Sequence, residues 1–150
     1  FKEEVERVLA NDSISSYVMV YTDFEEKIEH MYQLKERLAA GFLKLSDVRL
    51  NGMELREGAP QILSASFMGV RSEVLLHTLE EKGIYVSAGS ACSSHKRKAA
   101  GTLSAMGMEA AQRESTLRFS FSEENTFEEV DYALEVIGQV LPMLRKYSRH

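Results

Sequence analysis

The chain has 150 residues and a mass of 17.0 kDa, the size of one domain that can fold without disulfides or metals. Hydrophobic residues make up 44% and charged residues 27%, which excludes disordered, collagen-like and coiled-coil chains. The net charge of -5 argues against a nucleic-acid-binding domain, since such domains neutralise phosphates with excess Lys and Arg. Apolar runs are far shorter than the roughly 20 residues that cross a bilayer, and the acidic start does not resemble a secretory signal. We therefore expect a cytoplasmic protein without a membrane partner.

The first strong structural signal begins at Thr22. Residues 1–21 predict only a loosely attached N-terminal segment, so we expect a single domain over residues 22–150. Thr22 and Glu25 have the spacing of a capping box, which predicts a helix start. Apolar residues then recur at steps of three and four, which indicates an amphipathic helix. They are Phe24, Ile28, Met31, Leu34, Leu38, Phe42 and Leu45.

The middle of the chain predicts short strands and one further helix. Residues 48–50 and 61–67 have strand character and are separated by turn-forming Gly, Asn and Pro residues. Ser72 is placed to cap the next helix, and Gly83 to end it in the left-handed conformation. Residues 84–86 then predict a buried strand.

The last third predicts a loop, a strand and a closing helix. Small residues followed by cations over 87–101 indicate the loop, and apolar residues alternating with Arg118 and Ser120 indicate a half-buried strand. Thr126 and Glu129 form a second capping box before an apolar helical stripe. Short strands with interspersed helices predict an α+β fold, with a small, mostly antiparallel sheet and helices packed on one face.

Cys92 is the only cysteine, so an internal disulfide and a multi-cysteine zinc site are excluded. A free cysteine is usually a small buried hydrophobe. Cys92 instead follows Gly89, Ser90 and Ala91 and precedes the cations of residues 96–98. Such cations stabilise a thiolate, although they could equally form an ordinary solvated loop. We interpret Cys92 as an accessible, reactive thiol.

Metal and nucleotide sites have no support in the sequence. His30, His77, His95 and His150 lack metal-ligand spacing, and there is no glycine-rich phosphate motif. His95 follows Cys92 by three residues and could act as its base in a hydrolase, but nothing supplies a third group to orient it.

Arg118 is the second candidate functional residue. An arginine on the polar face of a strand is usually a surface charge or an ion-pair partner. Its planar guanidinium also matches a carboxylate in two-point contact, which suits an amino-acid substrate.

Three ordered motifs carry a family resemblance. Residues 87–94 read Ser-Ala-Gly-Ser-Ala-Cys-Ser-Ser, residues 103–108 read Leu-Ser-Ala-Met-Gly-Met, and residues 117–120 read Leu-Arg-Phe-Ser. Together they resemble the C-terminal small domain of NifS/IscS-type cysteine desulfurases, which are class V aminotransferase-like enzymes that use pyridoxal 5′-phosphate. The separation of Cys92 from Arg118, 26 positions, is similar to that in the branch with a long catalytic loop.

The resemblance implies an enzyme function for the protein as a whole. Cys92 would be the catalytic nucleophile that takes sulfur from L-cysteine as a persulfide and leaves L-alanine, and Arg118 would bind the substrate carboxylate. The sulfur would pass to an acceptor or scaffold protein for iron–sulfur cluster assembly, tRNA thiolation or a related pathway. Family membership also implies a homodimer.

Family members are much longer than this chain, and their cofactor-binding residues come from a large domain that precedes the small one. We therefore expect no cofactor-binding residue here and no activity from the isolated chain. Two alternatives stay open: a stand-alone persulfide carrier that needs Cys92 but not Arg118, and a non-catalytic ligand-binding or dimerisation domain.

Overall fold

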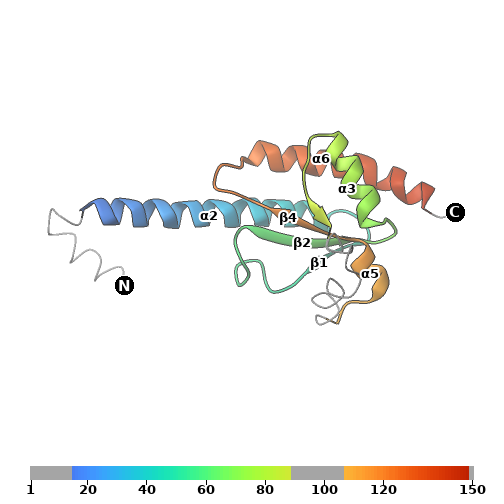
Figure 1. The fold of residues 1–150 in the computed structure, drawn as a ribbon, viewed down its shortest axis with the longest axis horizontal. Coiled ribbons are helices and arrows are strands. Elements are labelled where there is room, and N and C mark those ends of the chain that lie inside the picture. Colours follow the sequence, from blue (N-terminus) through green and yellow to red (C-terminus); the bar gives the residue numbers. More distant parts are fainter. Residues whose placement is uncertain (1–14, 89–106, 149–150) are drawn as a thin grey trace.

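The computed structural model describes residues 15–88 and 107–148. Its helices are α2 (Ser15–Leu43), α3 (Ser72–Glu81), α5 (Ala110–Glu114) and α6 (Phe127–Tyr147), and its strands are β1 (Val48–Asn51), β2 (Ile62–Phe67), β3 (Ser87–Ala88) and β4 (Thr116–Ser120). The strands form one antiparallel sheet in the order β1-β2-β4-β3 (Figure 1). This confirms the predicted α+β class.

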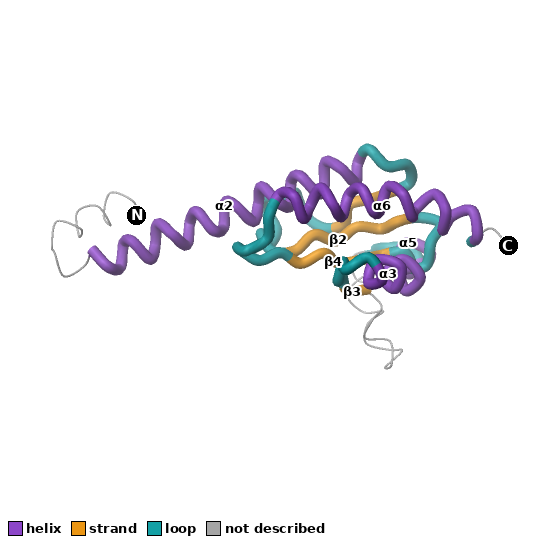
Figure 2. Tube along the Cα trace, turned by 90° about the horizontal axis from the view of Figure 1, so that it is seen from above, coloured by secondary structure: helices purple, strands orange, loops and turns teal. Residues whose placement is uncertain are grey.

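Helices α2 and α6 lie side by side across one face of the sheet (Figures 1 and 2). Helix α3 joins them at the β3–β4 edge, where it contacts α6 and both strands. The prediction of helices on one face therefore holds for these three elements. The short helix α5 was not predicted and lies against the opposite face, because a single turn leaves no periodic signal. Among the described residues, no helix has both the length and the hydropathy of a membrane span.

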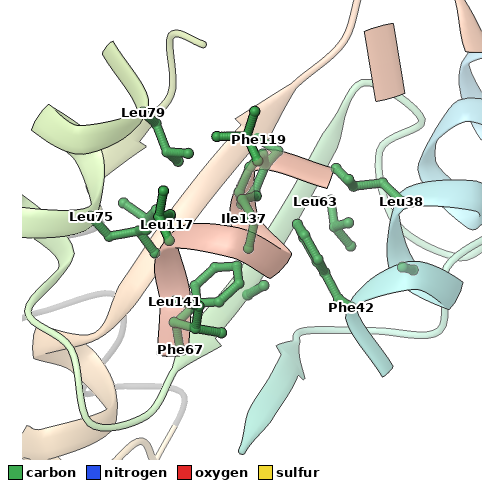
Figure 3. Close-up of a cluster of buried hydrophobic side chains, with 14 of the residues drawn as sticks. Leu38, Phe42, Leu63, Phe67, Leu75, Leu79, Leu117, Phe119, Ile137 and Leu141 are labelled. Carbon is green, nitrogen blue, oxygen red and sulfur yellow. The ribbon is translucent and has the colours of Figure 1, made fainter. Parts of the chain in front are cut away.

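The core lies between the sheet and the three long helices (Figure 3). Phe42 of α2 is fully buried, with its ring centroid 5.1 Å from that of Phe67 and 5.0 Å from that of Phe119. These separations suit tilted and edge-to-face aromatic pairs. The strands supply alternate residues to this face, and the helices supply stripes of aliphatic side chains. The remaining labelled members in Figure 3 are Leu38, Leu63, Leu75, Leu79, Leu117, Ile137 and Leu141.

Helix α2 starts earlier than predicted. Thr22 lies inside the helix, so the capping box proposed for Thr22 and Glu25 is wrong. A continuous helix provides its own backbone hydrogen bonds at that position and needs no cap. The first half of α2 projects beyond the sheet (Figure 1), which explains why Phe24 is 59% exposed although it belongs to the predicted apolar stripe. Whether residues 1–21 are loosely attached stays a prediction.

The second capping box is confirmed at the start of α6. The Thr126 hydroxyl accepts a hydrogen bond from the Glu129 amide at 3.2 Å, and the Glu129 carboxylate accepts one from the Thr126 amide at 3.1 Å. The Asn125 side chain also donates to this carboxylate at 2.8 Å. These hydrogen bonds, with that from Asn125 the strongest, lower the pKa of Glu129. Helix α6 therefore begins where the sequence predicted.

The ends of α3 confirm one prediction and correct another. Ser72 is the first helical residue and not the cap, because Arg71 occupies the cap position and makes no side-chain cap bond. The Ser72 side chain is instead almost completely buried. Gly83 does end the helix, with a φ of 79° and an amide that donates to the Glu80 carbonyl at 3.0 Å.

Residues 84–86 do not form the predicted strand. The Ile84 amide donates to the Leu79 carbonyl at 2.9 Å, which holds it to the end of α3, and Tyr85 is 80% exposed. An apolar cavity of about 540 Å³ is lined by residues 83–86 and by residues 119–121 at the end of β4. The segment after α3 pairs with β4 only from Ser87 onward, where β3 begins.

Two phenylalanines of α2 give a direct test of this packing. We expect Phe42→Ala to lower the free energy of unfolding by about 3–5 kcal/mol, because it leaves a cavity among buried rings. The control Phe24→Ala, at an exposed position of the same helix, should change it by less than about 0.5 kcal/mol. Chemical denaturation measures both, and equal losses would contradict the described core.

Candidate functional site

The two predicted site residues differ in what the structure says of them. Cys92 and the cations at 96–98 lie outside the described residues. Arg118 lies in β4, where its neighbours Leu117 and Phe119 are buried in the core and Arg118 itself is exposed on the opposite face. The period of two along a strand thus fixes which way the arginine turns.

Strand register places Arg118 in a polar row across the sheet. Ser64 of β2 and Ser87 of β3 are its direct partners on either side, and Asn51 of β1 pairs with Ser64. Directly opposed residues of an antiparallel pair share one face, with Cβ atoms about 4.5–5.5 Å apart. The row therefore reads Asn51, Ser64, Arg118, Ser87. The other three could not be predicted as members of this row, because register between distant strands is not encoded locally.

The guanidinium of Arg118 has no partner among the described residues. Within residues 15–88 and 107–148 it makes no hydrogen bond or ion pair, and the same is true of Arg49 and Arg71. The other described arginines, Arg37, Arg56, Arg113 and Arg145, are engaged in the fold. Arg37 donates twice to Asp131, at 2.8 Å each, and Arg56 donates twice to Glu29, at 2.7 and 2.8 Å. The bond from Arg37 lowers the pKa of the Asp131 carboxyl. Arg118 is thus not needed as an ion-pair partner in this part of the fold.

A buried hydroxyl chain lies beside the row. The Thr116 hydroxyl donates to the Gln112 carbonyl at 2.6 Å, which uses its only hydrogen. The Ser66 hydroxyl lies 2.7 Å from that of Thr116, so Ser66 must be the donor in this pair. Both side chains are almost completely buried, and each hydroxyl is paired as burial requires.

The orientation of the Asn51 amide follows from this chain. The Ser66 hydroxyl has already used its hydrogen, so the Asn51 atom 2.8 Å from it must be the donating nitrogen. The same nitrogen donates to the Ser64 hydroxyl at 3.3 Å, and the Asn51 oxygen accepts from the Gln112 side chain at 2.9 Å. We call Asn51, Ser64, Ser66, Gln112 and Thr116 the polar network. It joins β1, β2, β4 and α5 on the face that carries Arg118.

Three further titratable side chains make contacts within the fold. His30 donates from Nε2 to the Asn125 carbonyl at 2.7 Å, and His77 contacts Glu80 at 3.1 Å. Lys35 is only 4% exposed, and burial lowers the pKa of its ammonium, which donates to the Ala59 carbonyl at 3.0 Å. In the described part of the chain, no three His, Cys, Asp or Glu residues are grouped as metal ligands.

Comparison with known proteins gives one consistent family. The model of the aminotransferase class-V family matches residues 9–133. A NifS/IcsS protein homolog from Lactobacillus delbrueckii subsp. bulgaricus is 35% identical over 130 residues, which is 87% of this chain and 34% of that protein. A cysteine desulfurase IscS from Klebsiella pneumoniae subsp. pneumoniae is 36% identical over 133 residues, or 89% of this chain and 32% of the relative.

Solved structures agree with these relatives. A NifS-like protein superposes with a TM-score of 0.70 at 31% identity, covering 84% of this chain and 31% of its own. A cysteine desulfurase from Thermococcus onnurineus shares the fold, with a TM-score of 0.63 at 24% identity, over 77% of this chain and 26% of its own. The chain thus spans about one third of the length of the relatives it matches.

The polar network can be tested by its coupling. Thr116→Val keeps the shape of the side chain but leaves the Ser66 hydrogen without its acceptor, so we expect unfolding free energy to fall by about 1–3 kcal/mol. Adding Ser66→Ala removes the orphaned hydrogen, and the double variant should lose less than the sum of the two single losses. Strict additivity in denaturation curves would contradict the hydrogen bond between the two hydroxyls.

Proposed function

Since the chain belongs to the aminotransferase class-V family, we propose that it is the C-terminal, sulfur-accepting domain of a cytoplasmic cysteine desulfurase. One observation carries the proposal. An exposed arginine with no partner among the described residues lies directly opposite Ser87, and Ser87 lies five positions before Cys92 in the chain. Arg118, which would bind the carboxylate, and Cys92 are therefore linked by one strand pair and five residues of chain, a short connection for two groups that would act on one amino acid.

Members of this family depend on pyridoxal 5′-phosphate, which activates the amino-acid substrate by withdrawing electrons from its α-carbon. The described residues do not fit this cofactor. The buried lysine, Lys35, is bonded to a backbone carbonyl, and the charged residues that line the cavity near β4 are Glu128 and Glu129, which would repel a phosphate. We therefore expect the cofactor to be held by other parts of the protein.

Arg118 would bind the carboxylate of L-cysteine. Its five N–H donors form a rigid fork that fits both carboxylate oxygens, and this geometry fixes the orientation of the substrate as well as its affinity. The neighbours Ser64 and Ser87 are small, so the ligand can approach the guanidinium on either side. The side-chain sulfur of the bound substrate would then point away from Arg118.

Cys92 would take the sulfur. A chain of five residues spans at most about 18 Å when extended, so Cys92 can lie no farther than this from Ser87, the β3 residue paired with Arg118. Its thiolate would attack the sulfur of L-cysteine, forming a sulfur–sulfur bond as the carbon–sulfur bond breaks. The electron pair of the broken bond stays on the β-carbon of the substrate. This carbon gains a proton, and the product leaves as L-alanine.

The persulfide on Cys92 would then pass on its outer sulfur. A thiolate of an acceptor or scaffold protein attacks that sulfur, and Cys92 leaves as a thiolate ready for another cycle. Iron–sulfur cluster assembly and tRNA thiolation are pathways that consume sulfur in this form.

We also propose that the whole protein is a homodimer. In this chain we propose a single domain over residues 22–150, preceded by a loosely attached segment.

Persulfide formation tests the role of Cys92. We expect the chain, combined with the pyridoxal-binding domain of a cysteine desulfurase, cofactor and L-cysteine, to gain one sulfur atom by intact-protein mass spectrometry. Cys92→Ser should gain none, because it lacks the attacking thiolate. The chain alone should produce no alanine. An equal mass gain in Cys92→Ser would rule out this nucleophile.

Substitution of Arg118 separates a desulfurase domain from a simple persulfide carrier. Arg118→Lys keeps the charge but loses the two-point contact, so we expect the KM for L-cysteine to rise about tenfold or more in the same combined system. Reaction of Cys92 with a small thiol reagent should not change. An unaltered KM would favour the carrier, which needs Cys92 and not Arg118.

A further inference from the structure

We propose that Ser64 donates a second, specificity-determining hydrogen bond to the carboxylate that Arg118 binds. This inference rests on the proposed function and adds a residue that neither the motifs nor the family resemblance indicates. It follows from the position of Ser64 in the sheet and from the use of each hydrogen in the polar network.

Ser64 and Arg118 form a non-hydrogen-bonded pair, the type of antiparallel pair in which the two residues lie closer together. The amides of Phe67 and Phe121 donate to the Ser115 and Gln61 carbonyls at 2.8 Å each, just beyond the two ends of the β2–β4 ladder. These bonds flank the pairs Ser66–Thr116 and Ile62–Ser120, which are therefore non-hydrogen-bonded pairs. Because pair types alternate, Ser64–Arg118 is also non-hydrogen-bonded, and such pairs have Cα atoms only about 4.5 Å apart.

The hydrogen of the Ser64 hydroxyl is still available. In the polar network, Ser66 donates to Thr116, and Thr116 donates to the Gln112 carbonyl. Ser64 instead accepts from Asn51 and has no acceptor of its own among residues 15–88 and 107–148. It is the one hydroxyl of the network that is left with a free donor.

The surroundings make this donor suitable for an anion. Ser64 is half-buried and Arg118 exposed on the same face of the sheet, so the described residues leave both groups open to a ligand on that face. The hydrogen bond from the Asn51 amide polarises the Ser64 hydroxyl and strengthens it as a donor. A carboxylate has about four lone-pair sites and can accept a third hydrogen bond beside the two from arginine. The ligand class is thus a small carboxylate such as an amino acid.

The experiment uses the chain itself and the product amino acid. L-alanine is titrated while the Nε–H signal of Arg118 is followed in proton–nitrogen NMR spectra, with L-alaninamide as the ligand that lacks a carboxylate. Ser64→Thr and Ser64→Val are a matched pair, since both side chains have the same shape and only Thr keeps the hydroxyl. Ser120→Ala, on the same face two residues from Arg118, is the control for loss of an unrelated hydroxyl.

We expect L-alanine, and not L-alaninamide, to shift the signal. Ser64→Val should weaken binding about three- to tenfold, while Ser64→Thr and Ser120→Ala stay near the original affinity, because a hydrogen bond to a charged group is lost only in the valine variant. Equal affinity of the Val and Thr variants would overturn the role of Ser64.

The failures of the two proposals can be told apart. If Ser64→Val binds L-alanine as tightly as Ser64→Thr while L-alaninamide still leaves the Arg118 signal unshifted, Ser64 is excluded and the proposed role of Arg118 stands. If the original chain does not respond to L-alanine, the paired anion site is overturned, whereas the mass test on Cys92 remains an independent measure of the desulfurase proposal.

Discussion

The antiparallel pairing of β2 with β4 is the constraint on which the other features depend. It sets Leu63, Ala65 and Phe67 beside Leu117 and Phe119 on one face, where the long helices cover them. The same register brings the serines of β2 beside Arg118 on the other face. The core and the candidate site therefore lie on opposite faces of the same pair of strands. A shift by a single residue would exchange them and bury the arginine among phenylalanine rings.

Much of the fold could be predicted because its signals are local. Alternation identified β4 and its exposed arginine, and the reciprocal Thr126–Glu129 pair identified the start of α6. Where prediction failed, tertiary contacts decided the outcome. Thr22 has the residue type of a cap but lies within a longer helix, and residues 84–86 have strand character but are tied to the end of α3.

The candidate site could be predicted only in part, for the same reason. Arg118 was visible as a charge in an apolar alternation, and Cys92 as a lone thiol among small residues. Nothing in the sequence marks Asn51, Ser64 and Gln112 as site residues, since serine, asparagine and glutamine are common throughout proteins. They become informative only when register and hydrogen-bond direction are known, which are properties of segments far apart in the chain.

Helix α5 differs from the other helices in what holds it. None of its residues is buried, and the Gln112 side chain and carbonyl tie it to the sheet through the polar network. An element held by a few hydrogen bonds can detach at a fraction of the free energy needed to unfold the apolar side. Amide protection should therefore be graded across the sheet, with α5 exchanging early while β4 keeps Arg118 in place. The fold thus holds the strand that carries Arg118 through the apolar core, and holds α5 mainly through polar contacts.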